Sequence, residues 1–182
     1  MSEMTNNSID WRSDIYAVLR EHNIQQVCHV PDAGHAALIR NCEADNGMTV
    51  VGLTTEEDGV GVLTGAWLGG QRGVLLMQSS GVGNTINALA MPNACRIPLV
   101  TIVSMRGEWG EFVPWQIPMG QATPHVFEAM GVTVLRAERA EDVRETVNAA
   151  LKMAFDSNRQ VAVLISQKII GTKDFRAKER VL

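Results

Sequence analysis

The sequence lacks the features that mark secreted and membrane-spanning proteins. Its three cysteines (Cys28, Cys42 and Cys95) are odd in number and widely spaced, and no CxxC pair occurs. This argues against a disulfide framework and against a cysteine-rich zinc site. The longest apolar runs, such as residues 98–103, are far too short to span a bilayer. Residues 1–9 carry no apolar core of a signal peptide, so we expect a cytoplasmic protein with reduced thiols.

An excess of positive charge is also missing. Sixteen basic and twenty acidic residues give a net charge of −4, which offers no support for binding nucleic acid or an acidic membrane. Hydrophobic residues make up 46% and charged residues 20%, a balance that excludes disordered, collagen-like and coiled-coil chains. The length of 182 residues corresponds to roughly one domain. We expect a domain over residues 9–170, a disordered N-terminus at residues 1–8 and a C-terminal tail at residues 171–182.

Short apolar segments alternate with longer segments of helical character. The expected strands cover residues 25–30, 49–54, 73–77, 98–103, 133–135 and 160–165. The expected helices cover residues 9–22, 33–43, 56–70, 83–94, 123–130 and 140–155. Residues 104–120 show no clear period and predict a loop of functional length. Continuously apolar strands that alternate with helices indicate a parallel sheet covered on both faces. We therefore predict a three-layer αβα fold, of the α/β class, with about six parallel strands.

Ligands in such sheets bind outside the carboxyl ends of the strands, so the segments that follow the strands are the informative ones. One of them, Ser79-Ser80-Gly81-Val82-Gly83-Asn84, connects a strand to a helix. Its glycines would let the backbone approach a ligand closely. It matches neither the dinucleotide fingerprint nor the phosphate-binding P-loop. A tight turn that packs helix against sheet explains the segment equally well.

A second segment places three acids, Glu56, Glu57 and Asp58, at the start of a helix. Acids favour this position through the helix dipole alone. The helix behind them is rich in glycine, and each glycine costs about 1 kcal/mol relative to alanine. Close approach of another group must offset that cost. The sharper interpretation is a buried carboxylate against a ligand or against a second subunit.

Two further segments remain open between a structural and a functional role. His29 and His35 have no metal-ligand spacing, and His29 is best explained as a core histidine with satisfied hydrogen bonds. Asp32 and His35 follow a strand and could equally serve the fold or a ligand. Trp109 and Trp115 in the 104–120 loop suggest a lid or a subunit contact, although a hydrophobic plug over the domain's own sheet is as plausible.

Taken together, these motifs resemble those of one enzyme family. The matching segments are Val30-Pro31-Asp32, residues 56–61 with Gly65, residues 77–89, Arg106-Gly107 and residues 116–120. They resemble the pyrimidine-binding domain of thiamine diphosphate-dependent 2-oxoacid decarboxylases. Within that family the sequence is most similar to the alpha subunit of sulfopyruvate decarboxylase, and next to phosphonopyruvate decarboxylase.

The resemblance implies a thiamine diphosphate site with Glu56 at its centre. A family glutamate at this position bonds the N1′ nitrogen of the cofactor's aminopyrimidine, which promotes removal of the thiazolium C2 proton. Spacing to Gly65 assigns this role to Glu56 and not to Glu57. The cofactor contacts implied beside it are Pro31, Gln78, Gly81, Gly83 and Asn84. The substrate contacts implied are Asp32, His35, Arg106 and Gln116. Ala33 and Met77 depart from residues that some relatives use for substrate or proton transfer.

One family feature is missing from this chain. The Gly-Asp-Gly segment, through which the family holds the cofactor's diphosphate and its metal, does not occur. The resemblance therefore implies a separate beta subunit that supplies the diphosphate site and Mg²⁺, no metal ligand in this chain, and no activity for the chain alone. Self-association is expected as well. The implied reaction converts a small anionic 2-oxoacid, of the 3-sulfopyruvate or 3-phosphonopyruvate type, to an aldehyde and carbon dioxide.

Two other functions fit the same motifs. The chain could be a subunit of another thiamine diphosphate enzyme, such as a carboligase or an acyl transferase. It could also be a noncatalytic binding module that keeps the fold, although retention of Glu56 with Gly81, Gly83 and Asn84 counts against this.

Overall fold

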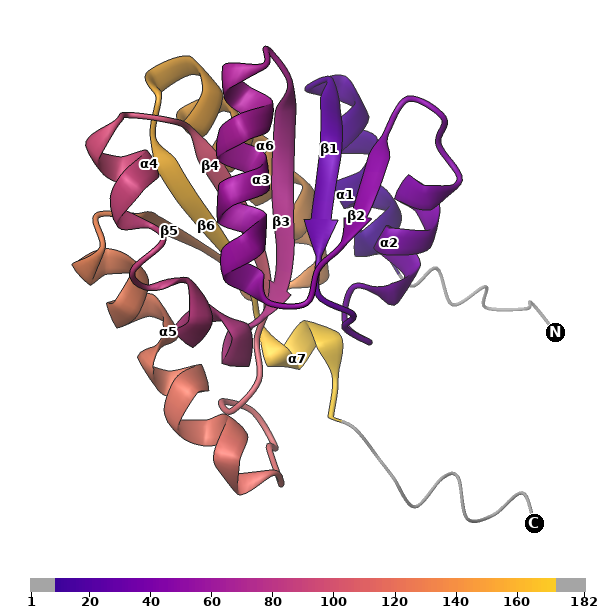
Figure 1. Ribbon diagram of the computed structural model, residues 1–182. Coiled ribbons are helices and arrows are strands. Elements are labelled where there is room, and N and C mark those ends of the chain that lie inside the picture. The colour runs from indigo at the N-terminus through magenta and orange to yellow at the C-terminus, as the bar shows by residue number, and fades with distance from the viewer. Residues whose placement is uncertain (1–8, 173–182) are drawn as a thin grey trace, which may run out of the picture.

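The computed structural model describes residues 9–172 as a sheet of six parallel strands between two layers of helices (Figure 1). The strand order is β2-β1-β3-β4-β6-β5. The strands are β1 (Ile24–His29), β2 (Thr49–Gly52), β3 (Arg72–Gln78), β4 (Leu99–Ser104), β5 (Thr133–Ala137) and β6 (Gln160–Ile165). This confirms the predicted fold class. The expected disordered N-terminus at residues 1–8 and nearly all of the expected tail lie outside the described residues.

The helices divide between the two faces of the sheet. One face carries α1 (Trp11–Glu21), α2 (Ala36–Glu43) and α6 (Ala140–Ser157), which enclose a core with Ile15, Leu38 and Leu151. The other face carries α3 (Glu56–Leu68), α4 (Ala90–Ala94) and α5 (Ile117–Ala129). Figure 1 shows α3 lying across the front of the sheet, with α1 and α6 behind it. A short helix, α7 (Gln167–Ile170), follows β6.

The sequence pattern accounts for the strands in the middle of the sheet. Every residue of β4 and β6 is buried, as expected for parallel strands that have a helix layer on both faces. At the edge of the sheet, β2 is short and partly exposed. All six strands run in the same direction, so their carboxyl ends meet at one edge. No helix among residues 9–172 is long and apolar enough to cross a membrane.

The helix predicted over residues 83–94 is wrong. The chain instead forms a 3₁₀ helix, η1 (Ser79–Thr85), and α4 covers only the last five residues of the predicted range. Glycine is a poor helix former, and Gly81 and Gly83 both lie in η1, where tertiary contacts determine the backbone path.

The loop predicted over residues 104–120 is also too long, because α5 begins at Ile117. Pro118 lies in the first turn of α5, where proline costs no hydrogen bond and its fixed φ favours the helix. Gly120 lies so close to the carbonyl of Arg106 that an added Cβ would be 1.9 Å from that oxygen. This contact with a distant segment holds the first turn of α5, and periodicity alone does not reveal it.

Candidate functional site

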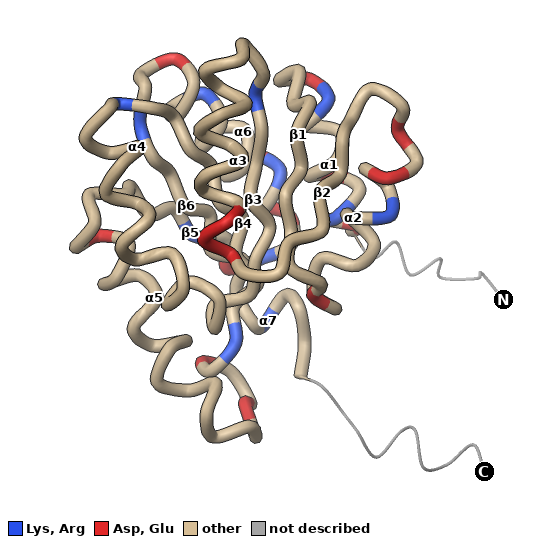
Figure 2. Tube along the Cα trace, viewed as in Figure 1, with Lys and Arg blue, Asp and Glu red and all other residues tan. Residues whose placement is uncertain are grey.

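Glu56 is the first residue of α3 and lies at the carboxyl edge of the sheet. Its side chain is buried, whereas Glu57 and Asp58 are exposed. Oε2 of Glu56 accepts a hydrogen bond of 2.8 Å from Nδ2 of Asn84 in η1. Figure 2 shows the three acids as a red stretch at one end of α3, and the rest of the helix carries no charge. The structure thus separates one buried carboxylate from two solvated neighbours.

The glycine-rich segment forms the seat of this carboxylate. A Cβ added at Gly81 would lie 2.0 Å from Oε1 of Glu56, so only glycine fits there. A Cβ added at Gly83 would lie 3.3 Å from Sδ of Met119. Among the described residues, no donor makes a hydrogen bond to Oε1 of Glu56. One carboxylate oxygen is therefore held by Asn84, and the other is free for a ligand.

Asp32 joins the carboxyl ends of three strands. Its Oδ2 accepts a hydrogen bond of 2.5 Å from Oγ of Ser104, which ends β4. Its Oδ1 accepts a bond of 3.2 Å from Nε2 of Gln78, which ends β3, and Oε1 of Gln78 accepts one of 2.9 Å from Ser80. Burial disfavours the charged carboxylate, but neighbouring His35 and the Ser104 hydroxyl outweigh it and lower the pKa of Asp32. The structure brings Asp32 and Gln78 together as one hydrogen-bonded group.

Two other candidate residues, His35 and Arg106, are buried within this chain. His35 has no exposed surface, and its Nε2 lies 3.1 Å from the carbonyl oxygen of Ile102. The guanidinium of Arg106 makes a two-bond ion pair with Glu111, at 2.6 and 2.7 Å. The side chains of Arg106 and Glu111 are only 6% and 3% exposed. Arg106 is therefore committed to an internal ion pair, whereas His35 uses Nε2 internally and its buried Nδ1 has no partner among the described residues.

His29 and Gln116 carry buried polar atoms without partners. His29 is buried, as expected, but its Nδ1 has no hydrogen-bond partner among the described residues, so the prediction of a satisfied histidine is wrong. Oε1 of Gln116 is likewise buried without a described partner. Pro31 is exposed just beyond β1. His29 and Pro31 help to line a cavity of about 370 Å³ at the carboxyl end of β1.

The aromatic residues of the 105–116 segment face outward. Trp109 is 53% and Trp115 is 77% exposed, so the prediction of a plug over the domain's own sheet is wrong. Sequence reasoning missed Glu111 and Gln167, which hold this segment in place. The only available signal was an acid five residues after Arg106 on the same loop, and no local pattern connects Gln167 to either residue.

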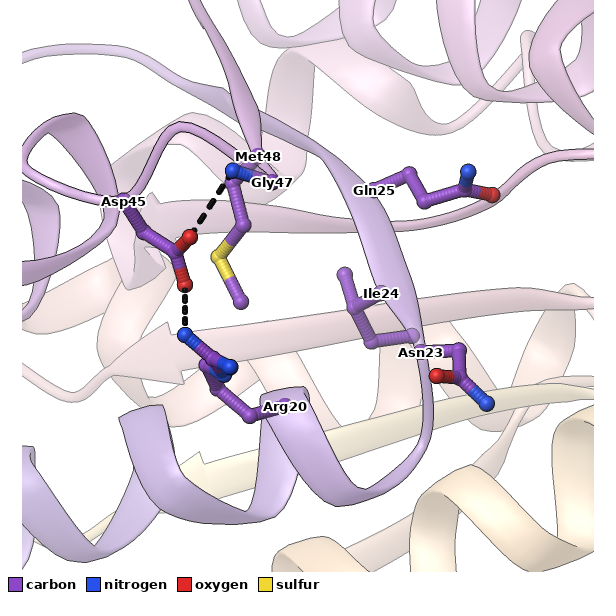
Figure 3. A pocket seen from close by; sticks show the side chains of 7 residues that line it. All are labelled: Arg20, Asn23, Ile24, Gln25, Asp45, Gly47 and Met48. Carbon is purple, nitrogen blue, oxygen red and sulfur yellow. Dashed lines mark hydrogen bonds and ion pairs between the residues drawn. The ribbon is translucent and has the colours of Figure 1, made fainter.

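A different cavity, of about 410 Å³, lies at the opposite edge of the sheet (Figure 3). It lies beside the amino end of β1 and is lined by Arg20, Asp45 and Met48, among others. The Asp45 carboxylate already accepts hydrogen bonds from Arg20 and from the amide of Gly47, both at 2.8 Å. The Asp45 carboxylate is thus satisfied within the chain, since Tyr16 donates to it as well, at 3.0 Å. Across residues 9–172, no group of three or more His, Cys, Asp or Glu side chains could hold a metal ion.

Comparison with known proteins identifies the class to which this fold and site belong. Residues 10–111 match the family described as thiamine pyrophosphate enzyme, N-terminal TPP binding domain. This match covers more than half of the chain and includes Glu56 and the glycine-rich segment. The chain belongs to this family, which confirms the resemblance seen in the sequence.

Named relatives narrow the class further. The chain is 32% identical to the sulfopyruvate decarboxylase subunit alpha of Methanococcus maripaludis over 83% of its own length and 91% of that subunit. It is 34% identical to a phosphonopyruvate decarboxylase of Streptomyces hygroscopicus, over 63% of its own length but only 29% of that enzyme. A 2-oxoglutarate:ferredoxin oxidoreductase of Magnetococcus marinus shares the fold, with a TM-score of 0.67 at 15% identity, over 85% of this chain and 28% of that chain. The chain is thus a homologue of sulfopyruvate decarboxylase alpha subunits.

Proposed function

We propose that the chain is the pyrimidine-binding subunit of a thiamine diphosphate-dependent decarboxylase that acts on a small anionic 2-oxoacid. The observation that carries the proposal is the buried carboxylate of Glu56. One of its oxygens is held by Asn84, and the other lies on Gly81 without a donor from the described residues. The similarity to sulfopyruvate decarboxylase alpha subunits along most of the chain supports the same assignment.

The residues present fit thiamine diphosphate. The free oxygen of Glu56 is the acceptor or proton partner that a ring nitrogen of an aminopyrimidine requires. Gly81 and Gly83 keep side chains away from that oxygen. Pro31, Gln78 and Asn84 are the further cofactor contacts that we assign in this chain. When bound, the cofactor supplies an electron-accepting ring for cleavage of the bond to the departing carboxylate.

This chain positions the aminopyrimidine ring of the cofactor and shares a proton with it. Glu56 holds a proton between its carboxyl group and the ring nitrogen, and Asn84 orients the carboxyl group by bonding its other oxygen. Burial of Glu56 excludes bulk water, which strengthens this hydrogen bond. Asp32 and Gln78 form the wall of the site at the ends of β1 and β3.

A partner subunit completes the site. The chain has no Gly-Asp-Gly segment, so we assign the diphosphate and Mg²⁺ to a beta subunit. One surface suits such a contact, and we call it the α3–α4 face: Gly61, Val62, Gly65, Leu68, Ile86 and Met91. A Cβ added at Gly61 or Gly65 would meet nothing within 4 Å, and Leu68 is 74% exposed. Small and apolar side chains beyond the acidic first turn of α3 permit close packing of a second subunit, or of a second copy of this chain.

The space near the site suits a small substrate. The cavity at the carboxyl end of β1, about 370 Å³ in volume, lies next to Pro31 and is lined by Asp32 and Ala33. Gln116 and His29 offer the unpartnered polar atoms described above. We propose Asp32 and Gln116 as substrate contacts. His35 and Arg106 are buried, and we propose that they support the residues that line the site without touching the substrate. The product would be an aldehyde and carbon dioxide.

The test uses the complex of this chain with the beta subunit that co-purifies with it. The complex should release carbon dioxide from 3-sulfopyruvate or 3-phosphonopyruvate in a panel of 2-oxoacids. The variant Glu56→Gln should keep its fold and assembly, because the change is nearly isosteric. It should lose about 10²- to 10⁴-fold in activity, the usual contribution of a positioned acid or base. Hydrogen–deuterium exchange at the C2 position of the cofactor should slow in parallel.

Glu57→Gln is the matched control. Glu57 lies one residue further on, rotated by about 100° around the helix, and it is exposed. Its variant should keep near-normal turnover. If Glu57→Gln abolished activity while Glu56→Gln retained it, the assignment of Glu56 would be wrong. Formation of a carbon–carbon bond without release of an aldehyde would point instead to a carboligase.

A further inference from the structure

We propose that Gln167, on the last helix, is a positioning residue for Glu56, and that it acts through Glu111, Arg106 and the glycine-rich turn. This inference rests on the proposed function. It concerns residues that contact neither Glu56 nor the space in front of it, and that come from two other parts of the chain.

The first step of this path is the clamp that Gln167 forms on the 106–113 segment. Gln167 is 1% exposed. Its Oε1 accepts hydrogen bonds from the amides of Glu108 and Trp109, at 3.1 and 3.0 Å. Its Nε2 donates to Oε2 of Glu111 at 3.0 Å. The backbone amide of Gln167 donates to Oε1 of Glu108 at 2.9 Å. Every polar group of this side chain is therefore used to hold one loop.

The second step is the carboxylate at the centre of that loop. Glu111 accepts the two bonds from Arg106 and a bond of 3.1 Å from the amide of Val113. Hydrogen bonds from Arg106, above all, lower the pKa of Glu111 to about 2. A fully ionised, buried carboxylate with this many donors fixes the segment in one conformation.

The third step connects the loop to the glycine-rich turn. The amide of Arg106 donates a hydrogen bond of 3.0 Å to Oγ of Ser79, the first residue of η1. A Cβ added at Gly107 would lie 2.3 Å from the carbonyl oxygen of Gln116, so the same part of the loop also packs on the start of α5. The hydroxyl of Thr123 in α5 bonds the carbonyl of Met119 at 2.8 Å and lies 3.4 Å from the carbonyl oxygen of Ser79. Ser79 is therefore bonded to the loop through Arg106 and packed against α5 at Thr123.

The last step connects the glycine-rich turn to Glu56. Gly81 lies two residues after Ser79 and forms the seat of the Glu56 carboxylate, and Asn84 lies in the same turn. A shift of the turn moves both partners of Glu56 together. A misplacement of about 1 Å in a reacting group can cost roughly 10²-fold in rate. The path Gln167–Glu111–Arg106–Ser79 therefore sets where Glu56 meets its ligand, across almost ninety positions of sequence between Gln167 and Ser79.

The test compares Gln167→Met with Gln160→Met. Methionine nearly matches glutamine in shape but makes none of its hydrogen bonds. Gln160 is also buried and donates a single bond, of 3.1 Å, to the carbonyl of Leu89, but it begins β6 at the opposite edge of the sheet. Both variants lose a buried glutamine, so a general loss of stability would affect both.

In the isolated chain, amide hydrogen exchange of residues 79–85 and 106–113 should accelerate on the order of tenfold in Gln167→Met and stay unchanged in Gln160→Met. Unchanged exchange over residues 79–85 in Gln167→Met would overturn the proposal. This measurement needs neither the cofactor nor the partner, so it holds even if the proposed function fails.

In the complex with the beta subunit, Gln167→Met should lower kcat by roughly 10- to 100-fold per folded active site, with little change in KM. Exchange at C2 of the cofactor should slow by the same factor, because that step reports on Glu56. A lower yield of folded protein with an unchanged kcat and an unchanged C2 exchange rate would mean that Gln167 serves stability alone, and the proposal would fall.

Discussion

At the scale of single residues, the position of the Glu56 carboxylate depends on a side chain that is absent. Gly81 occupies a place where even a methyl group would overlap Oε1 of Glu56. Neither residue reveals this relation locally, since they lie twenty-five positions apart. Glycine is therefore needed at position 81 because a side chain there would collide with Glu56. This differs from the conformational freedom that is usually cited for glycine-rich turns.

This relation predicts the effect of Gly81→Ala. The added methyl group should displace the carboxylate from Asn84 and reduce activity of the complex by roughly 10²-fold, with a modest loss of thermal stability. Gly52→Ala is the control, because a Cβ at Gly52 meets nothing within 4 Å. Steady-state kinetics and thermal unfolding of both variants measure the effect. Equal activity of the two variants would show that the seat tolerates a side chain.

The sequence predicted a buried carboxylate at the start of this helix, and the burial of Glu56 confirms it. Three acids open the helix after the second strand, and the spacing to Gly65 in the family motif singled out Glu56; the structure buries Glu56 and leaves Glu57 and Asp58 exposed. Arg106 shows where such reasoning fails. A cation beside a candidate site suggests an anionic ligand, but Glu111 already neutralises it at 2.6 Å. Only the folded loop brings the two groups together.

At the scale of elements, the 106–113 segment is held by one ionised carboxylate. The pKa of Glu111 is lowered to about 2, first by the hydrogen bonds from Arg106. A carboxyl group with a lowered pKa in the folded state stabilises the fold fully above its ordinary pKa of 4.5. That contribution declines below pH 4.5 and is lost as the pH falls through about 2.

The resulting prediction concerns Glu111→Gln. At pH 6 the variant should be less stable than the wild type by roughly 3 kcal/mol, because Arg106 loses its buried partner. The difference in free energy of unfolding should shrink as the pH falls from 4.5 towards 2. Urea unfolding at several pH values measures it. Glu145→Gln, an exposed position on α6, should differ little from the wild type at any pH. A difference for Glu111→Gln that is constant with pH would contradict the assignment.

Helices and strands were predictable where apolar residues follow a regular pattern along the sequence. They were not predictable where contacts with distant segments override the local preference for helix or loop. The fully buried β4 and β6 follow from their continuous apolar sequences. The helix expected over residues 83–94 does not form because η1 is shaped by two groups from other segments, the Glu56 side chain against Gly81 and the Arg106 amide that bonds Ser79. The start of α5 was missed for the same reason, since Gly120 packs on Arg106.

At the scale of the whole molecule, the α3–α4 face indicates that the chain associates with another chain. It combines glycines in open space with Val62, Leu68 and Met91, which are 40%, 74% and 50% exposed. Exposed apolar side chains that cluster on the uncharged part of α3, after its acidic first turn, are typical of an interaction surface. Within the described chain, Gly59 alone of the α3 glycines packs tightly, against Leu53 and Leu75.

We therefore expect the chain to form dimers or tetramers at micromolar concentration without its partner. Gly65→Arg should yield monomers, because a long charged side chain would stand in the packed face. The fold itself should persist, since arginine is a better helix former than glycine. Light scattering measures the mass of each species, and Glu145→Arg on the opposite layer is the control. A wild-type chain that is strictly monomeric would contradict the expectation.

The proposed division of the site between this chain and a beta subunit leads to a prediction about cofactor binding. The described part of this chain offers ring contacts around Glu56 and no cluster of acids for a metal. The two negatively charged phosphates of thiamine diphosphate need a cation and its ligands, which supply most of the electrostatic attraction. Calorimetry should therefore detect weak binding to this chain alone, and tight, Mg²⁺-dependent binding once the beta subunit is added. The variant Glu56→Gln, in complex, should weaken binding far less than it slows C2 exchange, because the diphosphate anchor stays intact. Tight binding of the cofactor by this chain alone would mean that the whole site, diphosphate included, resides in one subunit.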